Sequence, residues 1–267
     1  MTIERYANAG IPGLSRSVAT GDVRTALAEA SRATGVDFAY LAAKASIESG
    51  LDPQAKAPTS SAAGLFQFIE STWSEMVERH GAKIGLEKEA AALASGDVSR
   101  AERRRIMDLR FDPGVAARMG AEFAAENRDH LVSRLGREPE DVDLYLAHFL
   151  GPGGASKFLK AMEANPQGKA AELFPSAAKA NRSVFYDGGR ARSFNEIRER
   201  FDRKLEARAD DVTAPTGFAD AAGGRPKLSM PPISPGARPG AISLAAATPS
   251  LAASPKAGGD PWLTTLM

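Results

Sequence analysis

The stretch from Phe38 to Trp73 constrains this chain most, because it combines a helical pattern, one carboxylate and a loop of small residues. Apolar side chains recur at three- and four-residue spacing and predict a helix whose apolar stripe is made by Phe38, Leu41, Ala42 and Ala45. Glu48 comes seven residues after Leu41. At the helical repeat its side chain therefore projects over Leu41, on the edge of the apolar stripe.

The position of Glu48 favours acid–base chemistry. A carboxylate at an apolar edge loses part of its hydration, which favours the protonated form that can donate a proton. Lys44 lies four residues earlier and supports a different interpretation, in which the two side chains form an ordinary solvated pair. A lone helical glutamate is usually a surface residue. The segments that follow therefore decide between the two interpretations.

A polar residue inside an apolar segment follows this helix. Gly50 is expected to end the helix, and Asp52-Pro53 turns the chain into a loop of small residues at 58–64. The uncharged run 65–69 comes next and contains Gln67. Buried amides are kept where they find hydrogen-bond partners, so the sequence predicts specific partners for Gln67.

Taken together, these segments resemble the first two motifs of the lysozyme-like lytic transglycosylases of the soluble-lytic-transglycosylase type. The matching residues are the pair Glu48-Ser49, the segment Ala-Gly-Leu-Phe-Gln-Phe at 63–68, and the pair Thr72-Trp73. In that family a Glu-Ser pair ends a helix, and a Gly-Leu-Met-Gln loop lines the sugar cleft. The ordered set is much more specific than any one of its members.

Two later segments resemble the family's third and fourth motifs less closely. Residues 147–153 match the glycine of the Ala-Tyr-Asn-x-Gly motif, but His148 stands where the family has tyrosine and Phe149 where it has asparagine. The resemblance implies that the asparagine contacts substrate, so here His148 replaces that contact or the contact is absent. Tyr145 shares a helix face with His148, and both packing and a cleft role fit that placement. Tyr186 is the candidate for the fourth-motif tyrosine, which hydrogen-bonds the catalytic acid.

The resemblance implies cleavage of the β-1,4 bond between N-acetylmuramic acid and N-acetylglucosamine in peptidoglycan glycan strands, with formation of a 1,6-anhydro sugar. Glu48 would then be the catalytic acid and base. No cofactor or metal is expected, since the three histidines of the chain show no metal-binding spacing. The candidate substrate-binding residues are Ser49, Phe66, Gln67, Tyr145, His148 and Tyr186.

Two other functions fit the same pattern. Goose-type lysozymes place an aspartate after a similar Gly-Leu-Met-Gln segment, where this chain has Ile69 with Glu70 next to it. A hydrolytic muramidase would use Glu70 to activate water, and Ile69 favours the transglycosylase instead. The second alternative is a non-catalytic wall-binding subunit of a secretion or flagellar assembly. The departures at His148 and Phe149 permit it, and the intact Glu48 opposes it.

Composition excludes several other classes. The net charge of +1 over 267 residues gives no overall field that would recruit nucleic acid or an anionic membrane, and Arg103–Arg105 is interpreted as a solvated helix face. Without cysteine there is no disulfide or thiolate zinc site. Neither a transmembrane segment nor a secretory signal peptide is predicted, although the family implies the periplasm or cell envelope.

The predicted fold class is mainly α. We expect a flexible leader at 1–20, a lysozyme-like helical transglycosylase domain at 21–210 and a disordered tail, rich in proline, alanine and glycine, at 211–267. The more apolar residues 260–267 are either a docking peptide for a secretion or flagellar component or a disordered end. A small hairpin is expected at most, within residues 55–70.

Local signals predict several helix boundaries. Asp22 is expected to cap the first helix, Thr72-x-x-Glu75 and Ser193-x-x-Glu196 have the form of capping boxes, and the glycine- and proline-rich residues 151–154 are expected to end a helix. A glycine in mid-helix costs roughly 1 kcal/mol against alanine. Gly120 therefore predicts the close approach of another helix.

Overall fold

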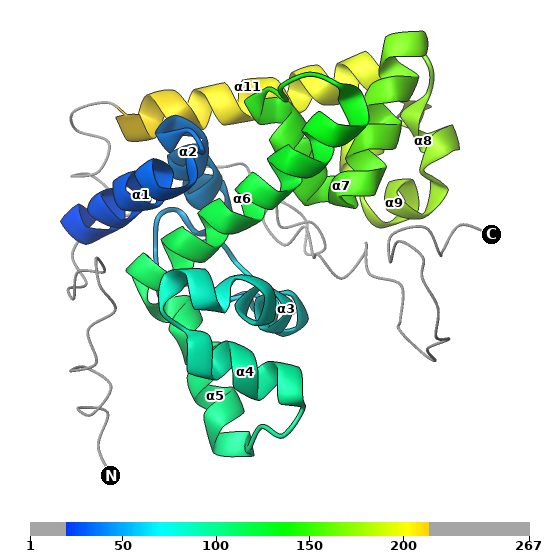
Figure 1. The fold of residues 1–267 in the computed structure, drawn as a ribbon. Helices are drawn as coiled ribbons and strands as arrows, with labels where there is room; N and C mark the ends of the chain where they lie inside the picture. Colours follow the sequence, from blue (N-terminus) through cyan, green and yellow to red (C-terminus); the bar gives the residue numbers. More distant parts are fainter. Residues whose placement is uncertain (1–19, 214–267) are drawn as a thin grey trace. The chain divides into compact units, whose positions relative to one another are not determined.

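A computed structural model describes residues 20–213, so residues 1–19 of the predicted leader and 214–267 of the predicted tail lie outside the described residues. Thr20, predicted in the leader, and residues 211–213, predicted in the tail, are helical. The described chain is mainly helical, as predicted (Figure 1). Its helices, in chain order, are α1 (Thr20–Thr34), α2 (Phe38–Ser49), α3 (Glu70–His80), α4 (Glu87–Ser95), α5 (Arg100–Asp108), α6 (Pro113–Leu135), α7 (Asp141–Ala164), α8 (Ala170–Leu173), α9 (Pro175–Ala180), α10 (Arg182–Phe185) and α11 (Phe194–Thr213). Short 3-10 helices cover Gly81–Ile84 and Leu109–Phe111, and the two strands are β1 (Tyr186–Asp187) and β2 (Arg190–Ala191).

The described chain divides into two compact units. The first unit holds residues 20–126 and 202–213, and the second holds residues 127–201. Both boundaries fall inside helices, so α6 and α11 each contribute to both units. Within the described residues, no helix is both long enough and apolar enough to cross a membrane.

The first unit is built from packed helix pairs. Helix α1 packs against α2, and α3 packs against α4 and α5 (Figure 1). Trp73 of α3 is fully buried, and its indole Nε1 donates a hydrogen bond to the carbonyl of Ile106 at 2.7 Å. A buried indole needs such an acceptor, so this bond fixes α3 against α5.

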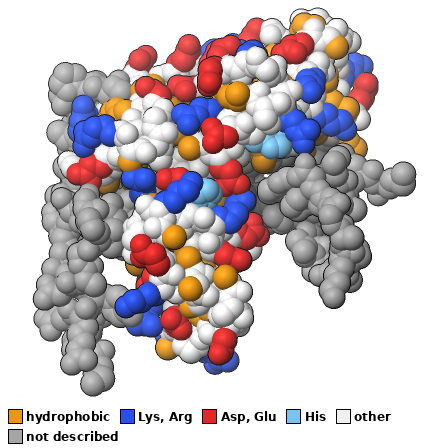
Figure 2. All heavy atoms as spheres, viewed as in Figure 1, with side chains coloured by type: hydrophobic (Ala, Val, Ile, Leu, Met, Phe, Trp, Pro, Cys, Tyr) orange, Lys and Arg blue, Asp and Glu red, His pale blue; other side chains and the backbone are white. Residues whose placement is uncertain are grey.

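Charged side chains connect α3 to the first part of α6. Arg79 Nη1 lies 2.6 Å from Glu126 Oε1, and His80 Nε2 lies 2.8 Å from Glu126 Oε2. Burial raises the pKa of Glu126, but the hydrogen bond from His80 and the charges of Arg79, His80 and Lys83 outweigh burial and lower that pKa. Basic and acidic side chains are also interspersed over the face shown in Figure 2, in keeping with the small net charge.

Aromatic packing organises the second unit. The ring of Phe149 lies 5.1 Å from that of Phe201 and 6.1 Å from that of Phe185, centroid to centroid. Tyr145 packs edge-on against the same Phe201 at 5.1 Å. Phe149, which occupies the position of the family's asparagine, is therefore a packing residue in this chain.

Helix α7 begins and bends at residues with clear signals. Glu140 and Asp143 form a reciprocal capping box at its start. Residues 151–154 were expected to end a helix, but helix resumes at once. Gly151 alone leaves the helical conformation, at φ 75°, and Pro152 starts the next turn because its fixed φ suits a first helical position. The predicted end is therefore a kink.

Two predicted helix starts are wrong. Helix α1 begins at Thr20, so Asp22 lies inside the helix and not at its start. Helix α3 begins at Glu70 after Ile69, which makes no side-chain cap, and Thr72 is buried within the first turn of the helix. The prediction for Ser193 is confirmed: its backbone N–H donates to the Glu196 carboxylate at 2.8 Å, and its Oγ accepts from the Glu196 N–H at 3.2 Å.

Strand content is low in the described chain. Residues 55–70 contain two isolated antiparallel bridges, Lys56 with Ala63 and Ala63 with Phe68. The one paired ladder among residues 20–213 is the two-residue hairpin of β1 and β2, which the sequence did not predict.

Candidate active site

Helix α2 places Glu48 one residue before its last residue, Ser49. The Asp37 side chain caps the helix start by accepting from the Tyr40 N–H at 3.0 Å. Gly50 ends the helix in the left-handed conformation at φ 65°, which glycine adopts without a Cβ penalty, as predicted. Leu41 is fully buried and Glu48 is half-buried, so the carboxylate lies at the edge of the apolar face as the periodicity predicts.

Lys44 is a buried cation one turn before Glu48. Its side chain is 1% exposed, so the interpretation of Lys44 as part of a solvated pair is wrong. Its Nζ lies 5.5 Å from the ring centroid of Phe66 and 5.6 Å from that of Phe123, within cation–π range of both. Burial lowers the pKa of Lys44 from its ordinary 10.5 to about 8, and the charge of Glu48 opposes that fall.

Ser49, the residue after Glu48, connects α2 to the following loop. Ser49 Oγ donates to the carbonyl of Leu65 at 2.9 Å and lies 3.0 Å from the carbonyl of Ala45 in its own helix. The Glu-Ser pair is thereby attached to the Gly-Leu-Phe-Gln segment, sixteen residues further along the chain. This hydrogen bond joins the two motifs that the sequence singled out.

Gln67 has the specific partners that its sequence context predicted. Its Nε2 donates to the carbonyls of Gly64 at 2.9 Å and Ala55 at 3.2 Å. Its backbone is left-handed at φ 51°, which is uncommon for a residue other than glycine and costs of order 1 kcal/mol. Two donated hydrogen bonds hold that conformation, and they close the loop from residue 55 to residue 67.

Gly64 and Phe66 pack tightly against neighbouring backbone. A Cβ built on Gly64 would lie 1.9 Å from the carbonyl oxygen of Arg110, so no side chain fits there. Phe66 is 2% exposed, and its ring covers Gly120 so closely that a Cβ on Gly120 would meet it at 2.8 Å. Gly120 therefore permits a close approach, but the approaching group is a loop phenylalanine and not the predicted second helix.

Arg110 holds the same loop from its other side, a role that the sequence analysis missed. Its buried guanidinium donates through Nη1 to the carbonyl of Ser61 at 2.7 Å and to that of Phe68 at 3.0 Å, and through Nε to that of Met107 at 2.9 Å. Lys44 was also missed, although a signal for it exists. Lys44 follows Leu41 by three residues and so shares the apolar face.

Three predicted substrate-binding residues belong to the second unit. Tyr145 is 1% exposed and packs on Phe201, whereas His148 is half-buried, with its ring 6.1 Å from that of Tyr145. Tyr186 lies in β1, half-buried, beneath the guanidinium of Arg182 at 4.8 Å from its ring centroid. Their contacts with substrate stay predictions, as do those of the three predicted substrate-binding residues in the first unit and the catalytic role of Glu48.

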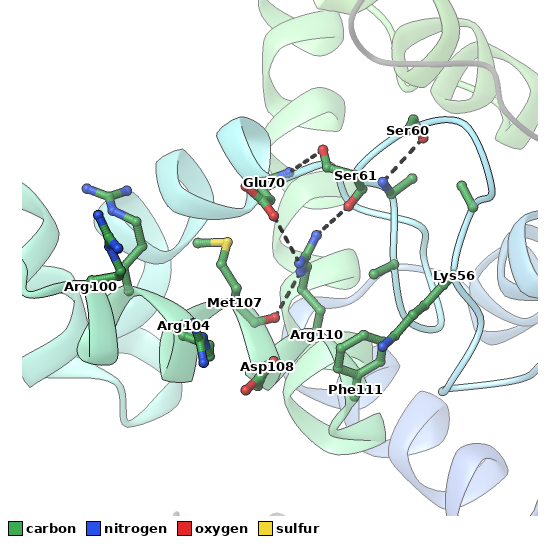
Figure 3. A pocket seen from close by; sticks show the side chains of 14 residues that line it. Lys56, Ser60, Ser61, Glu70, Arg100, Arg104, Met107, Asp108, Arg110 and Phe111 are labelled. Atoms are coloured by element: carbon green, nitrogen blue, oxygen red, sulfur yellow. Dashed lines mark hydrogen bonds and ion pairs between the residues drawn. The ribbon is translucent and has the colours of Figure 1, made fainter.

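Glu70, the carboxylate that a hydrolase would need, lines a different hollow. A pocket of about 450 Å³ is formed by the loop at 56–63, by α5 and by residues 110–111, and neither Glu48 nor Gln67 is among its described lining residues (Figure 3). The Glu70 side chain is 62% exposed, and its Oε1 lies 3.9 Å from Arg110 Nη2. Glu70 thus faces a guanidinium in a pocket that Glu48 does not reach.

Comparison with known families agrees with this geometry. Residues 25–135 match the family model described as "Transglycosylase SLT domain". The match includes helix α2 with Glu48, the Ser49–Leu65 connection and the loop that contains Gln67, and it ends before Tyr145, His148 and Tyr186. A domain of this family indicates cleavage of peptidoglycan glycan strands and hence action on the cell wall. Residues 25–135 of the chain thus form a transglycosylase SLT domain.

Proposed function

We propose that the protein is a lytic transglycosylase of the cell envelope, which cleaves the bond between N-acetylmuramic acid and N-acetylglucosamine with Glu48 as general acid and then general base. The hydrogen bond from Ser49 to Leu65 carries the proposal. It fixes the helix end that bears Glu48 to the loop that the family uses to line its sugar cleft. The family match over residues 25–135 supports the same assignment.

The reaction needs one carboxyl group. The Glu48 acid donates its proton to the glycosidic oxygen as the bond to C1 of the muramoyl sugar breaks. The cation-like C1 is then attacked by the 6-hydroxyl of the same sugar, and the Glu48 carboxylate takes the proton of that hydroxyl. The products are a 1,6-anhydro sugar and a free 4-hydroxyl, no water is consumed, and Glu48 returns to its starting state.

Lys44 supports the second half of this cycle. Once Glu48 has given up its proton, a negative charge stands at the edge of an apolar face. A buried ammonium one turn away on the same helix stabilises that charge, because attraction between charges is stronger where water is excluded. Phe66 supplies one of the two rings that hold Lys44, which gives this buried residue of the loop a part in the site.

Two features favour this route over hydrolysis. A glycoside hydrolase of either stereochemistry places its second carboxyl group within about 10 Å of the first, across the scissile bond. Here the carboxylate of Glu70 faces Arg110 in a pocket that Glu48 does not line. Ile69, at the position of the lysozyme aspartate, offers no carboxylate at all.

The test is mass spectrometry of the muropeptides that the protein releases from purified sacculi. We expect anhydro-muropeptides from the wild type and a loss of about 100-fold or more for Glu48→Gln, because a general acid contributes about 10²–10⁴ in rate. Glu78→Gln is the matched control, since Glu78 is exposed on α3. Thermal melts of both variants show whether each has folded.

Other products would reject the proposal. Reducing muropeptides that disappear in both Glu48→Gln and Glu70→Gln would show a hydrolase. If no release of muropeptides depends on Glu48, although Glu48→Gln melts like the wild type, the result would show a non-catalytic wall-binding subunit. Alanine substitution of His148 or Tyr186 tests their proposed contacts with the glycan strand, and a raised KM is expected for each.

A further inference from the structure

The pocket that contains Glu70 has the charge of a ligand site. Two carboxylates, Glu70 and Asp108, are outnumbered by five cationic side chains that line the same hollow: Lys56, Arg100, Arg103, Arg104 and Arg110. Arg100 and Arg104 lie on one side of the pocket and Lys56 with Phe111 on the other, while Arg110 and Glu70 lie between them (Figure 3). The surplus of positive charge favours an anionic ligand.

Most of these cations are available to a ligand. Arg110 is engaged by the loop carbonyls, and Lys56 lies over the ring of Phe111 at 4.9 Å. By contrast, within residues 20–213 no hydrogen bond or ion pair engages the guanidinium groups of Arg100, Arg103 and Arg104. Guanidinium groups bind carboxylates well because their planar donors match the two carboxylate oxygens.

The loop side of the pocket adds donors and small apolar surfaces. The hydroxyl oxygens of Ser60 and Ser61 accept hydrogen bonds from the backbone N–H groups of Ala62 and Glu70, which leaves both hydroxyl hydrogens to donate. Alanine side chains at 57, 62 and 63 line the same wall. The volume of about 450 Å³ is that of a small-ligand site and admits two or three amino-acid residues.

We propose that this pocket binds the peptide stems of peptidoglycan, through their carboxylates. Such stems combine carboxylates with alanine methyl groups and, where the third residue is a diamino acid, an ammonium group. The arginines match the carboxylates, the alanine wall matches the methyl groups, and Glu70 with Asp108 matches the ammonium group. A phosphate polymer carries no cation for the two carboxylates of the pocket, so the mixed charge favours a peptide.

The position of the pocket on the loop connects stem binding to the reaction. Ala63 lines the pocket, and the next residue, Gly64, accepts the Gln67 hydrogen bond that closes the loop. A ligand that orders one face of residues 56–63 therefore acts on the backbone that holds Gln67. This inference rests on the proposed function, because it assumes that a glycan strand with its stems is the substrate.

Titration of the full-length wild-type chain with the free-acid tripeptide L-Ala–γ-D-Glu–meso-diaminopimelic acid tests the proposal. We expect saturable binding that weakens as salt is raised. The Kd should rise about tenfold for the triple variant Arg100→Gln, Arg103→Gln, Arg104→Gln, because each exposed ion pair contributes modestly. Arg105→Gln is the control, since Arg105 is exposed on the same helix but does not line the pocket.

Several results would overturn stem binding. The first is that the wild type and the triple variant bind the tripeptide with equal affinity. The second is that a tripeptide whose carboxylates are amidated binds as tightly as the free acid. The third is that the protein binds inorganic polyphosphate but does not bind the tripeptide. If the triple variant melts early, Arg104→Gln alone is compared with Arg105→Gln, and equal affinity again overturns the proposal. No cleavage occurs in this titration, so it decides stem binding even if the sacculus assay rejects the transglycosylase.

A second readout connects the pocket to catalysis. Glycan strands with intact stems and strands stripped of stems by an amidase are cleaved in parallel, and the ratio of the two rates is measured. The wild type is expected to prefer stem-bearing strands, and the triple variant to lose most of that preference. An unchanged ratio in a folded triple variant would show that the pocket does not serve the substrate.

Discussion

Replacement of Lys44 by methionine should make the protein more stable and less active. Burial lowers the pKa of Lys44 to about 8, so keeping it charged at pH 7 costs about 3 kcal/mol, at about 1.4 kcal/mol per pH unit below the ordinary 10.5. The rings of Phe66 and Phe123 return about 1 kcal/mol or more through cation–π attraction. Methionine fills similar space without charge, so the free energy of unfolding should rise by about 1–2 kcal/mol.

The pKa of Lys44 also predicts how the stability gained by Lys44→Met changes with pH. The folded pKa of Lys44 lies below the unfolded value, so between about pH 8 and 10.5 the unfolded chain holds a proton that the folded chain has released. Stability linked to Lys44 therefore rises with pH across this window, and below pH 8 the full penalty is present. The advantage of Lys44→Met should shrink as pH rises from 8 towards 10.5.

Urea unfolding followed by tryptophan fluorescence measures both effects. Trp73 is buried in the same unit as Lys44, and a Trp262→Phe background leaves Trp73 as the reporter. Lys88→Met is the matched control, because Lys88 is exposed on α4 and its loss should change little. A Lys44→Met protein that is less stable at pH 7, or whose difference from wild type does not vary with pH, would refute the reasoning. Release of anhydro-muropeptides by Lys44→Met should fall despite the gain in stability.

Three further substitutions probe the packing. Gly64→Ala should lower the free energy of unfolding by about 3 kcal/mol or more, since its Cβ would overlap the carbonyl of Arg110. Gly50→Ala is the control, because Gly50 has a similar φ but a Cβ there would meet nothing within 4 Å. Its free energy of unfolding should fall by only about 1 kcal/mol in the same urea titration. Asp143 is fully buried and pairs with Arg137 and Arg198, so Asp143→Ala leaves both guanidinium groups without this carboxylate. Calorimetry should show the second unit destabilised by about 3 kcal/mol. Because the pKa of Glu126 is lowered in the fold, its ionised carboxylate stabilises the protein above about pH 4.5, and this stabilisation is lost as pH falls further. Glu126→Gln should therefore be less stable than the wild type at pH 7 and show a shallower acid transition by circular dichroism.

The parts of the fold that the sequence predicted are those set by local signals. Gly50 ends α2, the Ser193 box caps α11, and the periodicity placed Glu48 at the edge of a buried stripe. Each of these depends on contacts within one or two helical turns. The capping box predicted at Thr72 shows the limit of such signals. The helix already begins at Glu70, and Thr72 and Trp73 are buried inside it.

The residues that the sequence could not assign act over long separations. Arg110 donates to carbonyls 42 and 49 residues away, and no local spacing reveals such partners. Gly120 predicted that another group packs closely against the helix, but not that this group is Phe66, because a missing Cβ does not indicate which segment fills the space. Lys44 was mistaken for a surface residue because helical lysines usually are, and its two aromatic partners come from other segments of the chain.

These long-range polar contacts share one physical cause. The loop at 52–69 buries large apolar side chains only after Gly64. Its first part, residues 52–64, is mostly small or polar and buries too little apolar surface to offset the entropy of ordering its backbone. The carbonyls of the loop are instead held by side chains on both sides: Ser49 and Gln67 bind those of Leu65 and Gly64, and Arg110 binds those of Ser61 and Phe68. Hydrogen bonds to a charged guanidinium contribute about 1.5–3 kcal/mol each, more than neutral ones. A loop ordered by polar anchors keeps small residues at its surface, and on the side of Arg110 these residues line the pocket of about 450 Å³.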